Sequence, residues 1–222
     1  MQKAFQFVCT EHEVVPDKDS DLQPVVNAIV SRAVVVRTPD LIGSAVIIGN
    51  AIITSIFLVR NYRTVRIYLA NGEQSQAFVV AVDEQNNLAR LEEMTLCIHR
   101  RPPGGALKIA RCRDIGSPLL TTNTVTGRPV VKVGGMSYVT HLCGRKESEW
   151  KIDPGSPRGV MGSGVWNDEG DFVGLSLGQK IPSAFEQTRV DDATLLGDST
   201  LKLPRVYALP AEAVLDFAER AI

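Results

Sequence analysis

A thiol and an imidazole lie close together at one point of this sequence, and such a pair performs nucleophilic catalysis when the imidazole takes the thiol proton. Cys143 follows His141 by two residues. Residues two apart on an extended strand share one face, and their side chains run parallel rather than toward each other. We therefore interpret Cys143 and His141 as residues that fill the core or the surface, rather than as a catalytic pair.

A serine nucleophile would need a base from among only three histidines: His12, His99 and His141. Ser163 is a candidate nucleophile, but a serine hydroxyl without a base beside it is weak. His12 lies in a polar N-terminal segment, His99 borders a segment rich in proline and glycine, and His141 lies in a predicted strand. We predict that none of the three acts as a catalytic base.

Acidic and cysteine side chains are possible metal ligands, but their spacing here does not support a metal site. The acidic candidates lie in a polar stretch, 179–203: Glu186, Asp191, Asp192 and Asp198. They lack the glycine and the regular alternation of a calcium-binding loop. The cysteines match no zinc spacing: Cys9, Cys97, Cys112 and Cys143. We predict no metal and no cofactor.

Short β-branched runs dominate the elements that must position these residues. In the first half they are predicted as strands at 33–37, 43–48, 51–58, 64–69, 76–82 and 88–91. Asn71-Gly72 separates two of them, and both residues tolerate the positive φ of a tight hairpin. Six strands of this length suit one small barrel.

A second set of strands follows a break rich in proline and glycine, RRPPGG at 100–105. The predicted strands are 107–111, 118–122, 130–133, 137–142, 149–152, 163–166, 172–177 and 205–208. A short helix is expected at 21–30 and another at 210–221, each with an early proline. The predicted division is an arm at 1–20, a helix and first barrel at 21–99, a linker at 100–106, and a second barrel with the final helix at 107–222.

Charge and composition set the classes of partner. The chain has 222 residues, 24 basic and 25 acidic side chains and a formal net charge of −1, so nucleic acid is not an expected partner. No stretch is long and apolar enough to predict a membrane span. The sequence shows no signal-peptide pattern at its start, and the cysteines are expected to be free thiols. We therefore expect a cytoplasmic protein, or one within an assembly built in the cytoplasm.

Four segments, in order, resemble trypsin-like serine proteases of the HtrA/Deg type. They are GSAVII at 43–48 with IIT at 52–54, VD at 82–83 with NLARL at 87–91, GVMGSGVWNDEG at 159–170 with VG at 173–174, and VYALPAEAV at 206–214. The resemblance covers residue 29 to the C-terminus. It implies an all-β fold of two six-stranded antiparallel barrels of the chymotrypsin/trypsin type, with a short N-terminal and a C-terminal helix.

The resemblance also shows what the chain lacks. The family's histidine base, its aspartate and its serine nucleophile fall on Phe57, Asn87 and Met161. A phenyl ring cannot accept a proton, an amide cannot stabilise an imidazolium as a carboxylate does, and a thioether cannot be acylated usefully. Because the triad acts as a unit, each loss alone would lower turnover by orders of magnitude. We predict that the chain is not an enzyme.

We expect the chain to keep the shape of the family's substrate cleft although the catalytic residues are replaced. Gly159 and Gly162 still allow the tight turn of the nucleophile loop. The strand with Gly174, Leu175 and Ser176 resembles the edge that pairs with an extended substrate. The predicted peptide-binding residues are these three together with Gly159, Gly162 and Ser163. Phe57 and Met161 are expected to face each other there, either sealing the old cleft or receiving an apolar side chain.

Three functions remain open. The first is a non-catalytic protease fold, a pseudoprotease, that acts as a structural or assembly subunit with a protein partner or with itself. The second is a module that binds an extended peptide segment in the old cleft. The third is a protease with a non-standard centre at Ser163. The N-terminal arm favours the first function, since such arms are typical of chains that bind their neighbours in an assembly.

Overall fold

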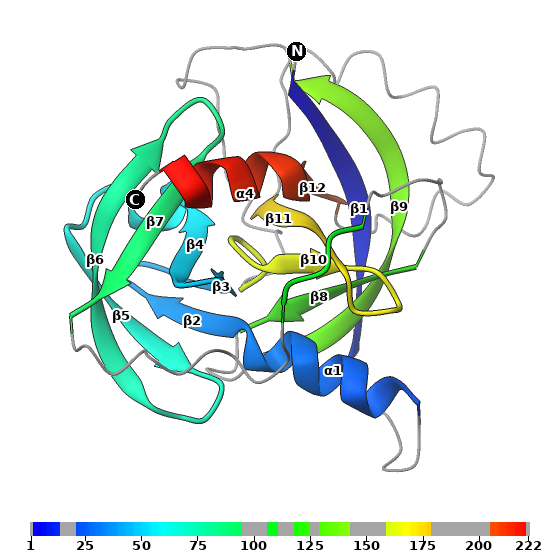
Figure 1. Ribbon diagram of the computed structural model, residues 1–222, viewed down its shortest axis with the longest axis horizontal. Helices are drawn as coiled ribbons and strands as arrows, with labels where there is room; N and C mark the ends of the chain where they lie inside the picture. Colours follow the sequence, from blue (N-terminus) through cyan, green and yellow to red (C-terminus); the bar gives the residue numbers. More distant parts are fainter. Residues whose placement is uncertain are drawn as a thin grey trace.

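The computed structural model describes residues 2–13, 21–94, 106–110, 118–124, 129–142, 159–178 and 205–220. Two sets of strands lie side by side, with helix α4 (Ala211–Arg220) across the region between them and α1 (Leu22–Ser31) below (Figure 1). The chain is mostly β. The predicted loop at 179–203, the predicted strand at 149–152 and most of the predicted linker lie outside the described residues.

The first set is a closed, six-stranded antiparallel barrel, as predicted, in the order β2-β3-β4-β7-β6-β5. Its strands are β2 (Ala33–Arg37), β3 (Ile42–Ile48), β4 (Ala51–Ser55), β5 (Thr64–Leu69), β6 (Gln74–Asp83) and β7 (Leu88–Glu93). The predicted hairpin between β5 and β6 is confirmed, with Gly72 at φ 86°.

One predicted strand of this barrel is shorter than expected. The apolar run 51–58 becomes strand β4 only as far as Ser55, and α2 (Ile56–Val59) is a short helix. The Ser55 hydroxyl accepts a hydrogen bond from the Phe57 N–H and caps the helix. This local cap turns the chain where the β-prone composition alone predicted a continuing strand.

The second set has six antiparallel strands in the order β1-β12-β11-β10-β8-β9, and β9 pairs again with β1. They are β1 (Gln2–Glu13), β8 (Pro118–Asn123), β9 (Val130–Leu142), β10 (Gly164–Trp166), β11 (Phe172–Gly178) and β12 (Arg205–Pro210). The predicted strands 130–133 and 137–142 form one strand. The prediction at 107–111 was wrong for the described part of that run, where only an isolated bridge joins Ile109 to Phe172.

The N-terminal segment differs most from the sequence prediction. An arm was expected at 1–20, but Gln2–Glu13 is a strand that pairs with β12 on one side and with β9 on the other. The backbone hydrogen bonds that an arm would have offered to a neighbouring chain are made within this one. The arm therefore no longer supports an assembly role.

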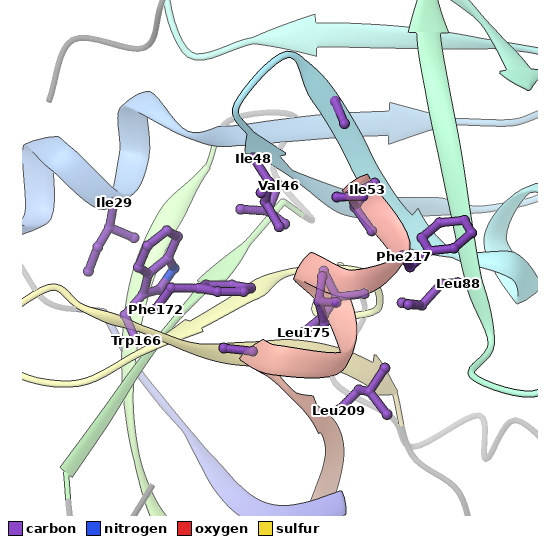
Figure 2. Close-up of a cluster of buried hydrophobic side chains, with 14 of the residues drawn as sticks. Ile29, Val46, Ile48, Ile53, Leu88, Trp166, Phe172, Leu175, Leu209 and Phe217 are labelled. Atoms are coloured by element: carbon purple, nitrogen blue, oxygen red, sulfur yellow. The ribbon is translucent and has the colours of Figure 1, made fainter. Parts of the chain in front are cut away.

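A single apolar cluster joins both sets of strands and both terminal helices. Figure 2 shows its side chains converging from α1, the first barrel, the second sheet and α4. Its largest buried members are Ile29, Ile53, Leu88, Trp166, Phe172 and Leu175, each no more than 2% exposed. Trp166 and Phe172 meet edge to face, with ring centroids 5.0 Å apart. The two halves are thus held together by burial of shared apolar surface.

Candidate functional site

Phe57, at the expected position of the family's histidine, lies in the first turn of α2. Its N–H points back to the Ser55 hydroxyl and to the Asn87 amide oxygen, which is 3.3 Å away. The Arg60 guanidinium carbon lies 5.4 Å from the centroid of its ring, within the range of a cation–π contact. The helix cap and this contact hold the ring at the wall of a cavity.

Asn87, at the expected position of the family's aspartate, is 2% exposed and has a φ of 55°, a left-handed conformation that asparagine tolerates well. Its Oδ1 accepts hydrogen bonds from the Phe57 N–H and the Ser55 hydroxyl, at 3.3 and 3.2 Å. Its Nδ2 is buried without an acceptor among the described residues. Phe57 and Asn87 are therefore brought together, as the resemblance implies, with one donor left over.

Met161, at the expected position of the nucleophile, lies in the loop before β10. Its carbonyl accepts a hydrogen bond of 2.8 Å from the Ser44 N–H, and its side chain packs against the core of the first barrel. It does not line the cavity that Phe57 lines. Ile56, Val59 and Val79 line this cavity and belong to the same apolar cluster as Met161, so the facing of Phe57 and Met161 stays a prediction.

The loop glycines have the backbone conformation of the predicted tight turn, and one of them also approaches the first barrel closely. Gly159 and Gly162 have φ of 87° and 80°. A Cβ on Gly162 would lie 2.1 Å from the Ser44 carbonyl oxygen and 2.3 Å from the Thr54 hydroxyl oxygen. Only a glycine fits there, so the loop is pressed against the first barrel.

Buried hydroxyl groups fasten this loop to the first barrel. The Ser44 hydroxyl lies 2.6 Å from the Gly159 carbonyl oxygen and 3.1 Å from the Thr124 hydroxyl. The Thr124 hydroxyl in turn lies 2.9 Å from the Gly43 carbonyl oxygen. Ser44 and Thr124 could not be found from the sequence, because they lie eighty residues apart and their contact leaves no local pattern.

Ser163, the alternative nucleophile, is fully buried. Its hydroxyl shares a 2.8 Å hydrogen bond with the Thr121 hydroxyl. A threonine is no base at neutral pH, and a buried hydroxyl does not reach an external substrate. The side chains of His12, His99 and His141 lie outside the described part of the structure.

The predicted peptide-binding edge is paired within the chain. Gly174 and Leu175 pair with β10 on one side and with β12 on the other. The Ser176 N–H donates to the Ser163 carbonyl oxygen, and the Ser176 carbonyl accepts from the Gly162 N–H, both at 2.8 Å. The interpretation of Gly174, Leu175 and Ser176 as an open edge was therefore wrong, because their own loop and strands already use the backbone.

A cavity of about 310 Å³ lies beside Phe57 and Asn87, and sequence reasoning missed it. Its other lining residues come from α2, the turn after it, β6 and the turn before Asn87: Ile56, Val59, Arg60, Tyr62, Val79, Val82 and Glu84. Beside the cavity, β6 carries three apolar side chains that are 43–49% exposed, Phe78, Val80 and Val82. Apolar residues in succession on β6 were the available signal.

Tyr62, at the rim of this cavity, donates a hydrogen bond from its hydroxyl to Asp40. That bond, together with burial and the negative charge of Asp40, raises the pKa of Tyr62 above its ordinary value. The phenol therefore keeps its proton and remains a donor up to high pH.

Metal ligands and membrane spans are not found in the part of the chain that the structure describes. No three side chains of the His, Cys, Asp or Glu type gather there in a way that could hold an ion. Neither α1 nor α4 nor any other described helix has the length and hydropathy needed to cross a bilayer. The acidic residues at 186, 191, 192 and 198 lie outside the described residues.

No protein-family model and no curated protein sequence matches this chain. Solved structures, in contrast, do match this chain. An inactive form of Rv3671c from M. tuberculosis superposes with a TM-score of 0.61 at 16% identity, over 95% of this chain and 96% of that one. A serine endoprotease from Yersinia pestis gives 0.64 at 19% identity, over 94% and 68%.

A third similar structure is the HtrA-type protease AlgW with a tripeptide, at a TM-score of 0.61 and 16% identity, covering 90% of this chain and 63% of that one. These likenesses cover 90–95% of this chain. The protein therefore has the fold of trypsin-like, HtrA-type serine proteases, which is the fold that the four sequence segments implied.

Proposed function

We propose that this chain is a non-catalytic member of the trypsin-like fold that acts by binding protein, as a structural or assembly subunit. The observation that carries the proposal is the set of contacts at the three positions where the resemblance puts the triad. Phe57 lines a cavity, the Asn87 amide oxygen accepts from the Phe57 N–H, and the partly buried Met161 packs against the first-barrel core. None of the three side chains can carry a proton between nucleophile and leaving group.

A protease with a non-standard centre is the competing enzyme hypothesis. Its only described candidate in the loop is Ser163, which is fully buried and bonded to Thr121. Attack by this hydroxyl would require the loop to open and a base to arrive from elsewhere. These costs favour the non-catalytic function.

Labelling with a fluorophosphonate probe tests the proposal directly. We expect no covalent adduct by intact mass spectrometry on the folded protein, with an active trypsin-like protease as the positive control. A stoichiometric adduct on the wild-type chain that disappears in Ser163→Ala would overturn the proposal. Retention of the adduct in that variant would point to a different nucleophile and overturn it equally.

Peptide recognition is a second candidate function, favoured by the cavity beside Asn87 and by the tripeptide carried by one structure of this fold. The native mass of the chain isolated from its source separates the two. A complex of fixed stoichiometry supports an assembly subunit, whereas a monomer supports transient recognition of peptide segments.

A further inference from the structure

The hairpin between β5 and β6 carries the single Asn-Gly pair of the sequence, Asn71-Gly72. Both residues are exposed, and Gly72 has a φ of 86°. Nothing lies within 4 Å of the position that a Cβ on Gly72 would take. The turn is therefore open to solvent, and the peptide nitrogen after Asn71 has no Cβ beside it.

An amide side chain and a backbone nitrogen that can attack it are neighbours in this turn. After losing its proton to a base in the solvent, the Gly72 nitrogen attacks Asn71 Cγ and closes a five-membered imide ring. The bond from Cγ to Nδ2 then breaks, and ammonia leaves with a proton taken from solvent. Water opens the imide at Cγ to give aspartate, or at the main-chain carbonyl to give isoaspartate. The sum is one water consumed and one ammonia released, with no oxidation or reduction.

The side-chain amide of Asn71 is held in an orientation that favours this attack. Its Oδ1 accepts a hydrogen bond of 3.0 Å from the Glu73 N–H. Because a backbone N–H can only donate, this bond identifies the amide oxygen, and the side chain is folded back across Gly72. Negative charge develops on that same oxygen when the Gly72 nitrogen adds to Cγ. The Glu73 N–H is thus a donor at the place where the transition state needs one.

One hydrogen bond opposes the attack, and it is a local one. The Gly72 N–H donates to the Leu69 carbonyl oxygen at 2.9 Å, so this bond must open before the nitrogen loses its proton. The Leu69 N–H separately donates to the Glu73 carbonyl oxygen at 2.9 Å and closes the hairpin without it. Loss of one exposed bond should slow the reaction about five- to tenfold. A need for global unfolding would slow it about a thousandfold or more.

We propose that Asn71 is a modification site, which the folded chain converts to aspartate and isoaspartate by attack of the Gly72 nitrogen on the Asn71 side chain. The co-reactant is water, and no other protein is required. The inference is independent of the proposed binding function, because it uses only the β5–β6 hairpin.

The two products should affect the hairpin differently. Each adds one negative charge at the tip of the turn. An aspartate carboxylate keeps an oxygen that accepts from the Glu73 N–H, so this product should leave the hairpin unchanged. Isoaspartate inserts one carbon into the main chain before Gly72, which changes the spacing that the bond to Leu69 requires.

The test follows the folded full chain at mildly alkaline pH beside the capped peptide Leu-Ala-Asn-Gly-Glu-Gln, which has the sequence of residues 69–74. Peptide mapping by mass spectrometry measures conversion at Asn71, and isoaspartate is separated from aspartate by chromatography. We expect both products, with isoaspartate present, and a folded-state rate within about tenfold of the peptide rate.

Two controls locate the reaction. Asn50 is also exposed in a hairpin turn, but Ala51 follows it, so Asn50 should stay unconverted over the same time. In Gly72→Ala a methyl group crowds the attacking nitrogen, and conversion at Asn71 should slow about tenfold. Asn71→Gln, which would need a larger ring, should show no conversion at that position and serves if Gly72→Ala disturbs the turn.

Three results would overturn the inference. One is a folded-state rate more than tenfold below the peptide rate that rises to it in urea, because attack would then require unfolding. Another is equal conversion at Asn50, which would remove any role for the Asn71-Gly72 turn. The third is aspartate without isoaspartate, because water would then attack the side chain directly. None of these results bears on the fluorophosphonate test, so the proposed function would stand or fall separately.

Discussion

Phe57 and Asn87, at the junction of α2 and β7, make fixed contacts with each other at the positions where the resemblance places a histidine and an aspartate. The Asn87 oxygen still holds the Phe57 N–H, which is a structural contact that does not need a charge. A phenyl ring and an amide move no proton, so Phe57 and Asn87 do not themselves offer acid–base chemistry. If the alignment of these positions is right, restoring the residue types should restore part of the chemistry.

Triple reversion is the residue-scale test of that alignment. The variant Phe57→His, Asn87→Asp, Met161→Ser should gain fluorophosphonate labelling, because it supplies nucleophile, base and orienting carboxylate together. Each single reversion should remain unlabelled, since the triad acts as a unit. A folded triple variant that never labels would mean that the three positions no longer converge in space.

Tyr62 and Asp40 predict a pH effect. The hydrogen bond to Asp40 raises the pKa of Tyr62 in the folded protein, so the stability it contributes is present below the ordinary tyrosine pKa near 10 and is lost as pH rises through the folded value. In ultraviolet titration, Asp40→Asn should move one tyrosine of the folded chain to lower pH, and Tyr62→Phe should delete that transition. An unchanged titration curve in Asp40→Asn would contradict the assignment.

At the scale of elements, the loop before β10 is fixed by a contact that only glycine allows. Gly162→Ala combines a φ of 80° with a Cβ placed 2.1 Å from the Ser44 carbonyl oxygen. We expect a loss of about 3 kcal/mol or more in the free energy of unfolding, measured by urea denaturation.

Gly72→Ala is the matched control for this loop. Its φ of 86° carries the same backbone penalty, but nothing lies within 4 Å of the added Cβ. The loss should stay near 1 kcal/mol, which is the cost of a positive φ alone. Equal losses in the two variants would show that the loop does not press on β3 and β4 as described.

Most strands of the first barrel were predictable because β-branched runs and turn residues are local signals. Ser55 shows where such signals fail, since a single hydroxyl cap ended β4 and began α2 within an apolar run. Gly134 and Gly135 show the reverse, because pairing with β1 and β8 carries β9 through two residues that predicted a break. The cavity could not be predicted, since it depends on where β5 ends beside β6, and that is set by tertiary packing.

At the scale of the whole molecule, the two halves are joined by one apolar cluster and by a small set of buried hydroxyl contacts. The cluster accounts for the stability of the joint, and the hydroxyls fix its register. Thr124 is the central one, since its hydroxyl reaches both Gly43 and Ser44 in the first barrel and also lies 3.2 Å from the Gly159 carbonyl oxygen.

Isosteric substitution tests this joint. Thr124→Val should cost about 1–3 kcal/mol of unfolding free energy, because it removes a donor and leaves the Gly43 carbonyl short of a partner. Thr122→Val is the control two residues earlier, where the hydroxyl is buried without a partner among the described residues. That variant should keep or raise stability in the same thermal or urea unfolding, and a loss as large as that of Thr124→Val would contradict this account of the joint.

The pairing of β1 with β12 and β9 sets an order of events while the chain is being made. The first barrel is built from a continuous stretch, residues 33–93, and all its strand partners have been synthesised once that stretch has left the ribosome. β1 is synthesised before any of it, yet its partner β9 follows only after the first barrel is complete, and its partner β12 comes near the end of the chain. A strand left waiting in this way is exposed to other nascent chains and to chaperones. Vectorial synthesis therefore favours a folded first barrel beside a second sheet that is completed only when β12 arrives to meet β1.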